Sequence, residues 1–239
     1  MILTSKQNSK IKELSKLKET KYRKLTNEFL IEGYHLVEEA IKKDIVLEIF
    51  EANESLKYPD SIQVSQDIIK KLSSTKTPQP IVARCKKMQA NNKLNKVLAL
   101  NNVQDPGNIG TMIRLAYAFG FDTVVVENTD IYNSKIIRSS QGAFFNLNLI
   151  ETKDLASYLI SLKTKGFKVY STILDLNAKK LNDVAFEKEQ IIVVMGNEGQ
   201  GISDTVKQLS DVNLYIPIEF ESLNVACAAA IILNKIKNN

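Results

Sequence analysis

The stretch IIVVMGNEGQGIS, residues 191–203, decides the fold class of this 239-residue chain. Its first five residues are all apolar, which is the length and pattern of a strand buried on both faces. Three glycines in the next six residues predict a turn whose backbone can approach a ligand closely. A buried strand that ends in such a turn is typical of an open α/β sheet, whose ligands bind beyond the carboxyl ends of its strands.

Four further apolar runs occur in the same part of the chain and alternate with segments of helical periodicity. These runs are Val97–Leu100, Thr123–Val126, Lys168–Ser171 and Asn213–Ile218. Since apolar residues occupy both faces of each run, we predict an α/β fold with a largely parallel sheet and helices on both faces.

The first part of the chain carries shorter signals. They predict strands over residues 28–31, 46–51 and 80–85, and helices over residues 34–43 and 66–72. Residues 88–96, MQANNKLNK, are polar and aperiodic and predict a linker. We therefore predict a small α/β domain over residues 1–90 and a larger domain over residues 91–239.

Composition narrows the class of protein. Hydrophobic residues make up 44% and charged residues 25%, as in ordinary globular proteins. No apolar run reaches the roughly 20 residues of a membrane-spanning helix, and residues 1–6 do not resemble a secretory signal. Cys85 and Cys227 are far apart and lack metal-type spacing. We expect a cytoplasmic protein with no membrane segment and no metal site.

Basic residues gather near the amino terminus of a chain whose net charge is +5. Residues 6–24 hold seven lysines and one arginine against two glutamates, while Ile11, Leu14 and Leu17 recur at helical spacing. This pattern predicts an amphipathic helix whose outer face is a basic stripe. Such a stripe is either a solvated surface or a site that attracts phosphates.

Residues 101–116, NNVQDPGNIGTMIRLA, follow the first strand of the larger domain. Asp105-Pro106-Gly107 predicts a turn, and Asn108 is a suitable N-cap for a helix that carries Arg114. We expect Asn108 and Arg114 to face one crevice. Only four of the 32 basic residues are arginines, so an arginine here suggests a planar fork that grips a phosphate. The alternative is a helix cap followed by a surface arginine.

Two more loops carry polar residues at strand ends. The turn after Met195 matches neither a Walker loop nor the dinucleotide fingerprint, and Ser203 can cap the helix that follows it. Residues 216–226, IPIEFESLNVA, place Ser222 and Asn224 directly before a helix of small residues. Capping alone would explain Ser222 but not the whole string.

These segments together resemble the three sequence motifs of the SpoU (TrmH-type) branch of the SPOUT RNA 2′-O-ribose methyltransferases. DPGNIGTMIRLA resembles the first motif, MGNEGQGIS the second, and IP followed by ESLNVACAAAI the third. RSSQGA, residues 138–143, is similar to the intermediate R-x-S-x-G-A segment of the family. FLIEG, residues 29–33, resembles the start of the ribosomal-protein-like substrate-binding domain of members that modify ribosomal RNA. The loop between Pro217 and Ser222 is shorter than the family usually has.

The resemblance implies a C-terminal trefoil knot, a homodimer, the cofactor S-adenosylmethionine and structured RNA as partner. It implies that backbone groups of Gly196, Ile216 and Leu223 hold the cofactor, with Thr172 near its adenine. The residues implied to line the reacting side are Asn108, Arg114, Glu198, Ser222 and Asn224.

The family mechanism makes the matching arginine a general base, but a guanidinium stays protonated in proteins. We therefore expect Arg114 to grip an RNA phosphate, while Ser222, Asn224 or water assists loss of the hydroxyl proton.

Three other functions remain open: a catalytically inactive RNA-binding protein of this fold, a transfer-RNA 2′-O-methyltransferase, and a base-modifying SPOUT enzyme. The extra amino-terminal domain favours ribosomal RNA as the substrate.

Overall fold

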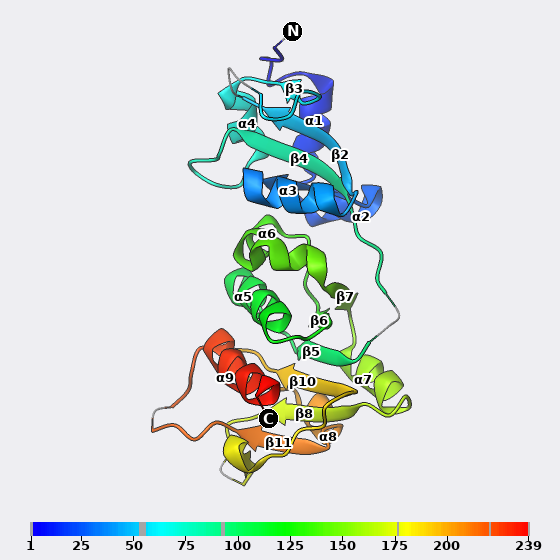
Figure 1. Ribbon diagram of the computed structural model, residues 1–239, viewed down its shortest axis with the longest axis vertical. Coiled ribbons are helices and arrows are strands. Elements are labelled where there is room, and N and C mark those ends of the chain that lie inside the picture. Colours follow the sequence, from blue (N-terminus) through cyan, green and yellow to red (C-terminus); the bar gives the residue numbers. More distant parts are fainter. Residues whose placement is uncertain (1, 53–55, 92–93, 176, 220, 239) are drawn as a thin grey trace. The chain divides into compact units, whose positions relative to one another are not determined.

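The computed structural model describes residues 2–52, 56–91, 94–175, 177–219 and 221–238, which form two compact units (Figure 1). Unit 1 comprises residues 1–89 together with 132–145, and unit 2 comprises residues 90–131 and 146–239. A single boundary near residue 90 separates the two units, except that the segment 132–145 groups with unit 1. The predicted linker includes residues 92 and 93, which lie outside the described part of the chain.

Unit 1 contains a four-stranded sheet in the order β1-β4-β2-β3. β4 is antiparallel to both β1 and β2, and β3 pairs with β2 in parallel. The predicted strands and helices of this part are all present, within two residues of their predicted ends. The elements are α1 (Ser9–Lys16), α2 (Thr20–Thr26), β1 (Glu28–Glu32), α3 (Tyr34–Lys42), β2 (Val46–Glu51), β3 (Ile62–Gln63), α4 (Gln66–Leu72) and β4 (Ile81–Lys86).

The basic segment forms two short helices, α1 and α2, where one amphipathic helix was predicted. Ile11, Leu14 and Leu17 are buried in a core cluster of unit 1, as their spacing predicts. The chain turns after Leu17, and Arg23 packs inward at 4% exposure instead of joining the outer face. Its guanidinium donates to the Leu17 carbonyl oxygen over 2.7 Å. Because the turn supplies this acceptor, Arg23 does not belong to the exposed basic stripe.

The segment 132–145 contains α6 (Ser134–Ser140) and most of the 3₁₀ helix η1 (Gln141–Asn146). Tyr132 and Phe144 pack with Phe29 of β1, with ring centroids 4.8 to 6.2 Å apart. Arg138 forms an ion pair with Glu32 at the end of β1. The RSSQGA string therefore belongs to unit 1 by its contacts, for which the sequence gives no local signal.

Unit 2 is built on a seven-stranded sheet in the order β7-β6-β5-β10-β8-β11-β9, and every strand pair in it is parallel. This confirms the predicted α/β fold class. The strands β7 and β9 were not predicted. The elements are β5 (Lys96–Leu100), α5 (Pro106–Ala118), β6 (Thr123–Glu127), β7 (Asn148–Thr152), α7 (Leu155–Lys163), β8 (Lys168–Thr172), β9 (Lys179–Lys180), η2 (Leu181–Asp183), β10 (Ile191–Met195), α8 (Asp204–Gln208), β11 (Val212–Tyr215) and α9 (Val225–Lys237).

Burial on both faces explains the unbroken apolar runs. Val97 and Val194 point into a core that α7 and α8 cover, whereas their neighbours along the strands point to the opposite face. All five residues of β10 are buried. The helices α5 and α9 pack against each other. β11 ends at Tyr215, three residues before the predicted end, because Ile216, Pro217 and Ile218 leave the sheet to form a loop.

Candidate functional site

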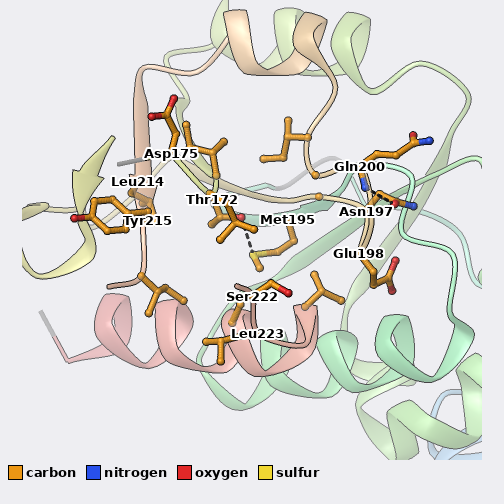
Figure 2. Close-up of a pocket in the computed structure, with 18 of the residues that line it drawn as sticks. Thr172, Asp175, Met195, Asn197, Glu198, Gln200, Leu214, Tyr215, Ser222 and Leu223 are labelled. Carbon is orange, nitrogen blue, oxygen red and sulfur yellow. Dashed lines mark hydrogen bonds between the residues drawn. The ribbon is translucent and has the colours of Figure 1, made fainter. Parts of the chain in front are cut away.

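A cavity of about 720 Å³ opens in unit 2 at the carboxyl ends of β8, β10 and β11 (Figure 2). Its volume falls in the range of small-molecule sites, and its lining mixes apolar side chains with a few polar groups. The walls come from the chain after Thr172, from the turn after Met195 and from the loop around Ser222. The cavity therefore lies where an open parallel sheet is expected to bind a ligand.

All four residues predicted to hold a cofactor line this cavity: Thr172, Gly196, Ile216 and Leu223. The Thr172 hydroxyl donates to the Val194 carbonyl oxygen over 3.0 Å. It also lies 3.6 Å from the sulfur of Met195 (Figure 2). Because its proton is used within the sheet, Thr172 can offer a ligand only an acceptor. Leu223 is 38% exposed and presents an apolar surface.

The turn after β10 closes tightly on itself. A Cβ atom on Gly196 would lie 2.4 Å from the Gly201 carbonyl carbon, so only glycine fits there. Asn197 organises the rest of the turn: its Oδ1 accepts the amide protons of Gly199 and Gln200, and its Nδ2 donates to the Asn102 carbonyl oxygen over 2.9 Å. Asn197 was not among the predicted site residues, although an asparagine before glycines is a known signal for such a side-chain-to-backbone turn.

Three predicted residues from three separate motifs form one hydrogen-bonded chain. Asn224 Nδ2 donates to Asn108 Oδ1 over 3.1 Å, and Asn108 Nδ2 donates to Glu198 Oε1 over 2.9 Å. Asn224 Oδ1 accepts the amides of Ala226 and Cys227, which caps α9 and fixes the orientation of the side chain. Since Glu198 lines the cavity, this chain of side chains leads from α9 through α5 to the ligand site.

The prediction that Asn108 is the N-cap of its helix is wrong. Asp105 takes that position, its carboxylate accepts the Asn108 amide over 2.9 Å, and α5 begins at Pro106. A proline at the first helical position has no amide proton to satisfy, which favours a start there. The Asn108 side chain is thereby released for its contacts with Glu198 and Asn224.

Ser222 lines the cavity next to Leu223 and is exposed. Ser203 stands at the N-cap position of α8 as predicted, but its side chain makes no capping hydrogen bond. Within the short loop before Ser222, Ile218 also lines the cavity. Phe220 lies outside the described residues.

Arg114 is exposed and is not brought to the hydrogen-bonded chain. Six residues at about 100° each place its side chain roughly 120° around α5 from Asn108. The expectation that the two side chains face one crevice therefore stays a prediction. Among the hydrogen bonds and ion pairs of the described residues, none involves Arg114. Its guanidinium is available to a partner outside the chain.

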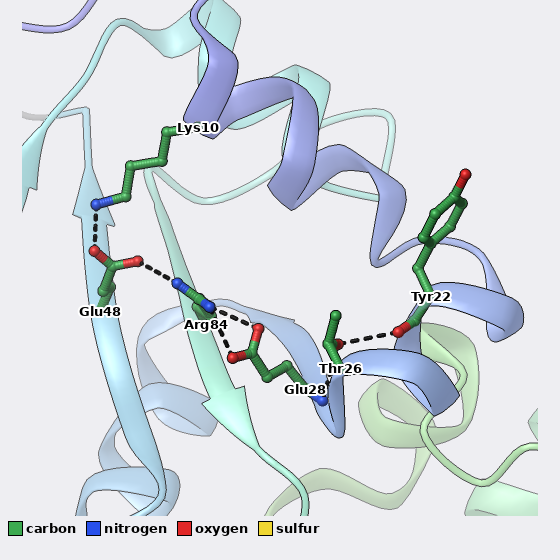
Figure 3. Close-up of polar contacts among 6 residues, drawn as sticks. All are labelled: Lys10, Tyr22, Thr26, Glu28, Glu48 and Arg84. Atoms are coloured by element: carbon green, nitrogen blue, oxygen red, sulfur yellow. Dashed lines mark hydrogen bonds and ion pairs between the residues drawn. The ribbon is translucent and has the colours of Figure 1, made fainter.

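The other three arginines have acceptors within unit 1. Arg84 donates two hydrogen bonds to Glu28, over 2.7 and 2.8 Å, and one to Glu48 over 3.0 Å (Figure 3). The hydrogen bond to Glu28 raises the pKa of Arg84 further. Arg23 and Arg138 bond the groups described above. Three of the four arginines thus form hydrogen bonds or ion pairs inside the protein. Within the described chain, Arg114 is the one arginine for which no such contact is found.

Three charged residues at the cavity were missed by sequence reasoning: Asp175, Asp204 and Lys207. The charged atoms of Asp175 and Lys207 are 3.8 Å apart. None of the three was among the predicted site residues, and only the fold places them there. Among the described residues, no cluster of histidine, cysteine or acidic side chains is arranged to hold a metal ion. In the same part of the chain, no helix is both long and apolar enough to span a membrane.

Comparison with known proteins gives matches across nearly the whole chain. Residues 95–234 match the SpoU rRNA methylase family, and residues 8–83 match the MRM3-like substrate binding domain. The chain is 39% identical over 245 residues to the 23S rRNA (guanosine(2553)-2′-O)-methyltransferase RlmP of Bacillus subtilis, and 97% of each chain is covered.

Solved structures agree with these matches. A putative RNA methyltransferase of the TrmH family from Porphyromonas gingivalis is 29% identical and superimposes with a TM-score of 0.86, covering 97% of this chain and 98% of that one. The AdoMet-bound rRNA methyltransferase from Sinorhizobium meliloti shares the fold at 22% identity, with a TM-score of 0.87 over 100% and 97% of the two chains.

Proposed function

Since the chain belongs to the SpoU rRNA methylase family, we propose that it is an enzyme that methylates a ribose 2′-hydroxyl of ribosomal RNA. The methyl donor is S-adenosylmethionine. The observation that carries the proposal is the hydrogen-bonded chain Asn224–Asn108–Glu198, which joins three distant motifs at the edge of one cavity.

The cavity fits the donor in size and chemistry. Its volume of about 720 Å³ accommodates a nucleoside with an amino-acid tail. Gly196, Ile216 and Leu223 line the cavity and offer backbone groups, and Thr172 offers an acceptor for an exocyclic amine. Carboxylates of Glu198 and Asp175 suit a cationic ligand. When bound, S-adenosylmethionine supplies an electrophilic methyl group.

The protein's own task is to align the ribose oxygen and to ease loss of its proton. In transfer, the 2′-oxygen would take the methyl group as the bond between that group and the donor sulfur breaks, which leaves a neutral thioether, and the hydroxyl proton would pass to an acceptor. Ser222 lines the cavity and Asn224 follows two residues later at the start of α9, and these side chains orient the hydroxyl or a water that takes the proton. Asn108 holds Asn224 in place through the 3.1 Å hydrogen bond.

Arg114 reaches this site from a second copy of the chain. Tyr117 lies one turn beyond it on the same face of α5 and is 50% exposed, and Ile231 on the adjoining α9 is 41% exposed. Exposed apolar side chains on two packed helices support a homodimer through this face. In the dimer, the guanidinium of Arg114 grips a phosphate of RNA at the partner's cavity.

Unit 1 binds the RNA, and its match to a substrate-binding domain supports this assignment. The exposed lysines of α1 and α2 attract phosphates. The division of labour follows the predicted domains, residues 1–90 for RNA and residues 91–239 for chemistry, with a trefoil knot in the latter. We place the protein in the cytoplasm, because its Bacillus subtilis relative is a bacterial rRNA methyltransferase and bacterial ribosomes lie in the cytoplasm.

The test is transfer of a labelled methyl group from S-adenosylmethionine to bulk RNA from cells that lack the gene. We expect label in ribosomal RNA, at a 2′-O-methyl position absent from those cells. Label in transfer RNA would change the substrate, and label on a base would overturn the ribose assignment. Binding of S-adenosylmethionine without any transfer would identify an inactive RNA-binding protein.

A further inference from the structure

A buried polar pair lies outside the cavity lining, next to the glycine-rich turn. Asn101 directly follows β5 and is 1% exposed, and Glu127 ends β6 and is 7% exposed. Asn101 Nδ2 donates to Glu127 Oε2 over 2.6 Å. Burying a carboxylate and an amide is unfavourable unless each of their polar atoms finds a partner.

Each remaining oxygen of the pair accepts a backbone amide proton of another element. Asn101 Oδ1 accepts the amide proton of Ser203 over 2.8 Å, and Glu127 Oε1 accepts that of Leu155 over 2.8 Å. The backbone amide of Asn101 donates to the Met195 carbonyl oxygen over 2.9 Å. Asn101 therefore contacts the chain on both sides of the turn 196–202, immediately before it and immediately after it.

The surrounding donors and acceptors permit only one orientation of the Asn101 side-chain amide. An amide N–H at Ser203 must meet an oxygen, and an ionised carboxylate at Glu127 must meet an N–H, so the Asn101 side chain can point only one way. A carboxylate at position 101 would have no proton for Glu127. The pair thus works as a unit, with the acid at 127 and the amide at 101.

We propose that Asn101 and Glu127 are positioning residues for the cofactor cavity. They fix Ser203 and with it the far end of the turn whose residues 196–202 line the cavity. The near end is already fixed by β10. This inference rests on the proposed function, because the cavity is the one assigned to S-adenosylmethionine.

A swap of the two side-chain types tests the pair. Asn101→Asp sets two carboxylates at hydrogen-bonding distance, where both cannot ionise. In Glu127→Gln, the side-chain oxygen can accept a proton from only one of the two N–H donors, Asn101 Nδ2 and the Leu155 amide. The new NH2 group then faces the other donor. In the double variant, the new glutamine would donate to the new aspartate and accept the Leu155 amide, while the new aspartate would also accept the Ser203 amide. All three hydrogen bonds return without a change in net charge.

We expect each single variant to raise the Kd for S-adenosylmethionine roughly tenfold at a mildly alkaline pH, measured by calorimetry on the full chain. The double variant should bind within about threefold of the wild type. The KM for S-adenosylmethionine should follow the Kd, while kcat at saturating donor and the affinity for RNA stay near wild-type values. Asn148→Asp is the matched control, since Asn148 bridges a loop at the start of β7, away from the cavity.

A pH series adds a second readout for Asn101→Asp. A proton shared between the two carboxylates restores the lost hydrogen bond, so the pKa of the pair is raised in this variant. Affinity should therefore return as the pH falls through that pKa and be lost as the pH rises above it. The charged groups around the pair on the neighbouring elements are Glu151, Lys153 and Asp154 at the end of β7 and Asp204 after Ser203, and all four are exposed. All are present in the wild-type protein, whose own pH series corrects for them.

Single variants that unfold at lower temperature but bind the donor like the wild type would make the pair merely structural and overturn the inference. A folded double variant that does not recover binding would also overturn it. If Asn101→Asp does not fold, Glu127→Gln and the double variant decide the question. A wild-type protein that does not bind the donor would overturn the proposed function and this inference together.

Discussion

The guanidinium of Arg114 differs from the 28 lysine ammonium groups of the chain in geometry rather than in charge (28 being the 32 basic residues less four arginines). A planar fork holds a phosphate through two parallel hydrogen bonds, whereas an ammonium acts as a point charge. We therefore expect Arg114→Lys to lower kcat/KM for RNA at least roughly tenfold and to leave the Kd for S-adenosylmethionine unchanged. Methyl transfer and calorimetry measure the two quantities. Unchanged turnover would contradict the role of the fork.

Gly196 and Gly199 offer a matched pair in one turn. A Cβ on Gly196 would meet backbone atoms at 2.4 to 2.7 Å, whereas the nearest atom to a Cβ on Gly199 is 3.7 Å away. We expect Gly196→Ala to weaken donor binding at least roughly tenfold and to reduce the free energy of unfolding by about 1–3 kcal/mol. Gly199→Ala should bind like the wild type. Equal behaviour of the two variants in calorimetry would argue against the close approach at Gly196.

At the scale of elements, α1 and α2 combine a structural face with a charged one. Ile11, Leu14 and Leu17 are core residues, so deleting residues 1–24 would disrupt unit 1 and could not isolate the effect of charge. Substitution of exposed lysines is the sharper experiment, and Lys12 and Lys16 are exposed.

We expect Lys12→Gln with Lys16→Gln to weaken RNA binding and to reduce the salt slope of log K by roughly 1.5, because two phosphate contacts are lost. Filter binding at several salt concentrations measures the slope. The control pair is Lys165→Gln with Lys188→Gln, at exposed positions before the amino ends of β8 and β10. An equal slope for both pairs would identify the lysines of α1 as an ordinary solvated surface.

The whole molecule is expected to be a dimer through the exposed faces of α5 and α9. Ile231→Glu should convert it to a monomer, because a charge buried in an apolar interface is strongly unfavourable. Ile160→Glu is the control, since Ile160 is 50% exposed on α7. Light scattering after size exclusion measures the mass. A dimer that persists in Ile231→Glu would exclude this interface.

A dimer that shares its sites also predicts complementation between defective chains. Arg114→Ala and Ser222→Ala should each be inactive as homodimers. When both are co-expressed, about half of the dimers are mixed and one of their two sites is intact, so about a quarter of wild-type activity should return. No recovery would mean that Arg114 acts within its own chain or not at all.

The sequence by itself determined the fold class and predicted where the site lies. Unbroken apolar runs such as Ile191–Met195 arise where both faces of a strand are buried, so their pattern identifies a covered parallel sheet. Glycine and asparagine strings directly after those runs mark the ligand loops, because backbone turns of this kind need particular residue types. Gly196, Ile216 and Leu223 stand in the motifs that these loops resemble, and Thr172 was implied by the same resemblance. All four line one cavity.

Only the tertiary structure decided which side chains meet. β7 and β9 escaped prediction because Asn148–Thr152 mixes polar and apolar residues and Lys179–Lys180 is an exposed edge, so neither carries a buried-strand pattern. The start of α5 was decided by competition between Asp105 and Asn108 for one cap. The bond between Asn101 and Glu127 spans 26 positions of sequence. Such contacts depend on the alignment of parallel strands, which no local pattern encodes.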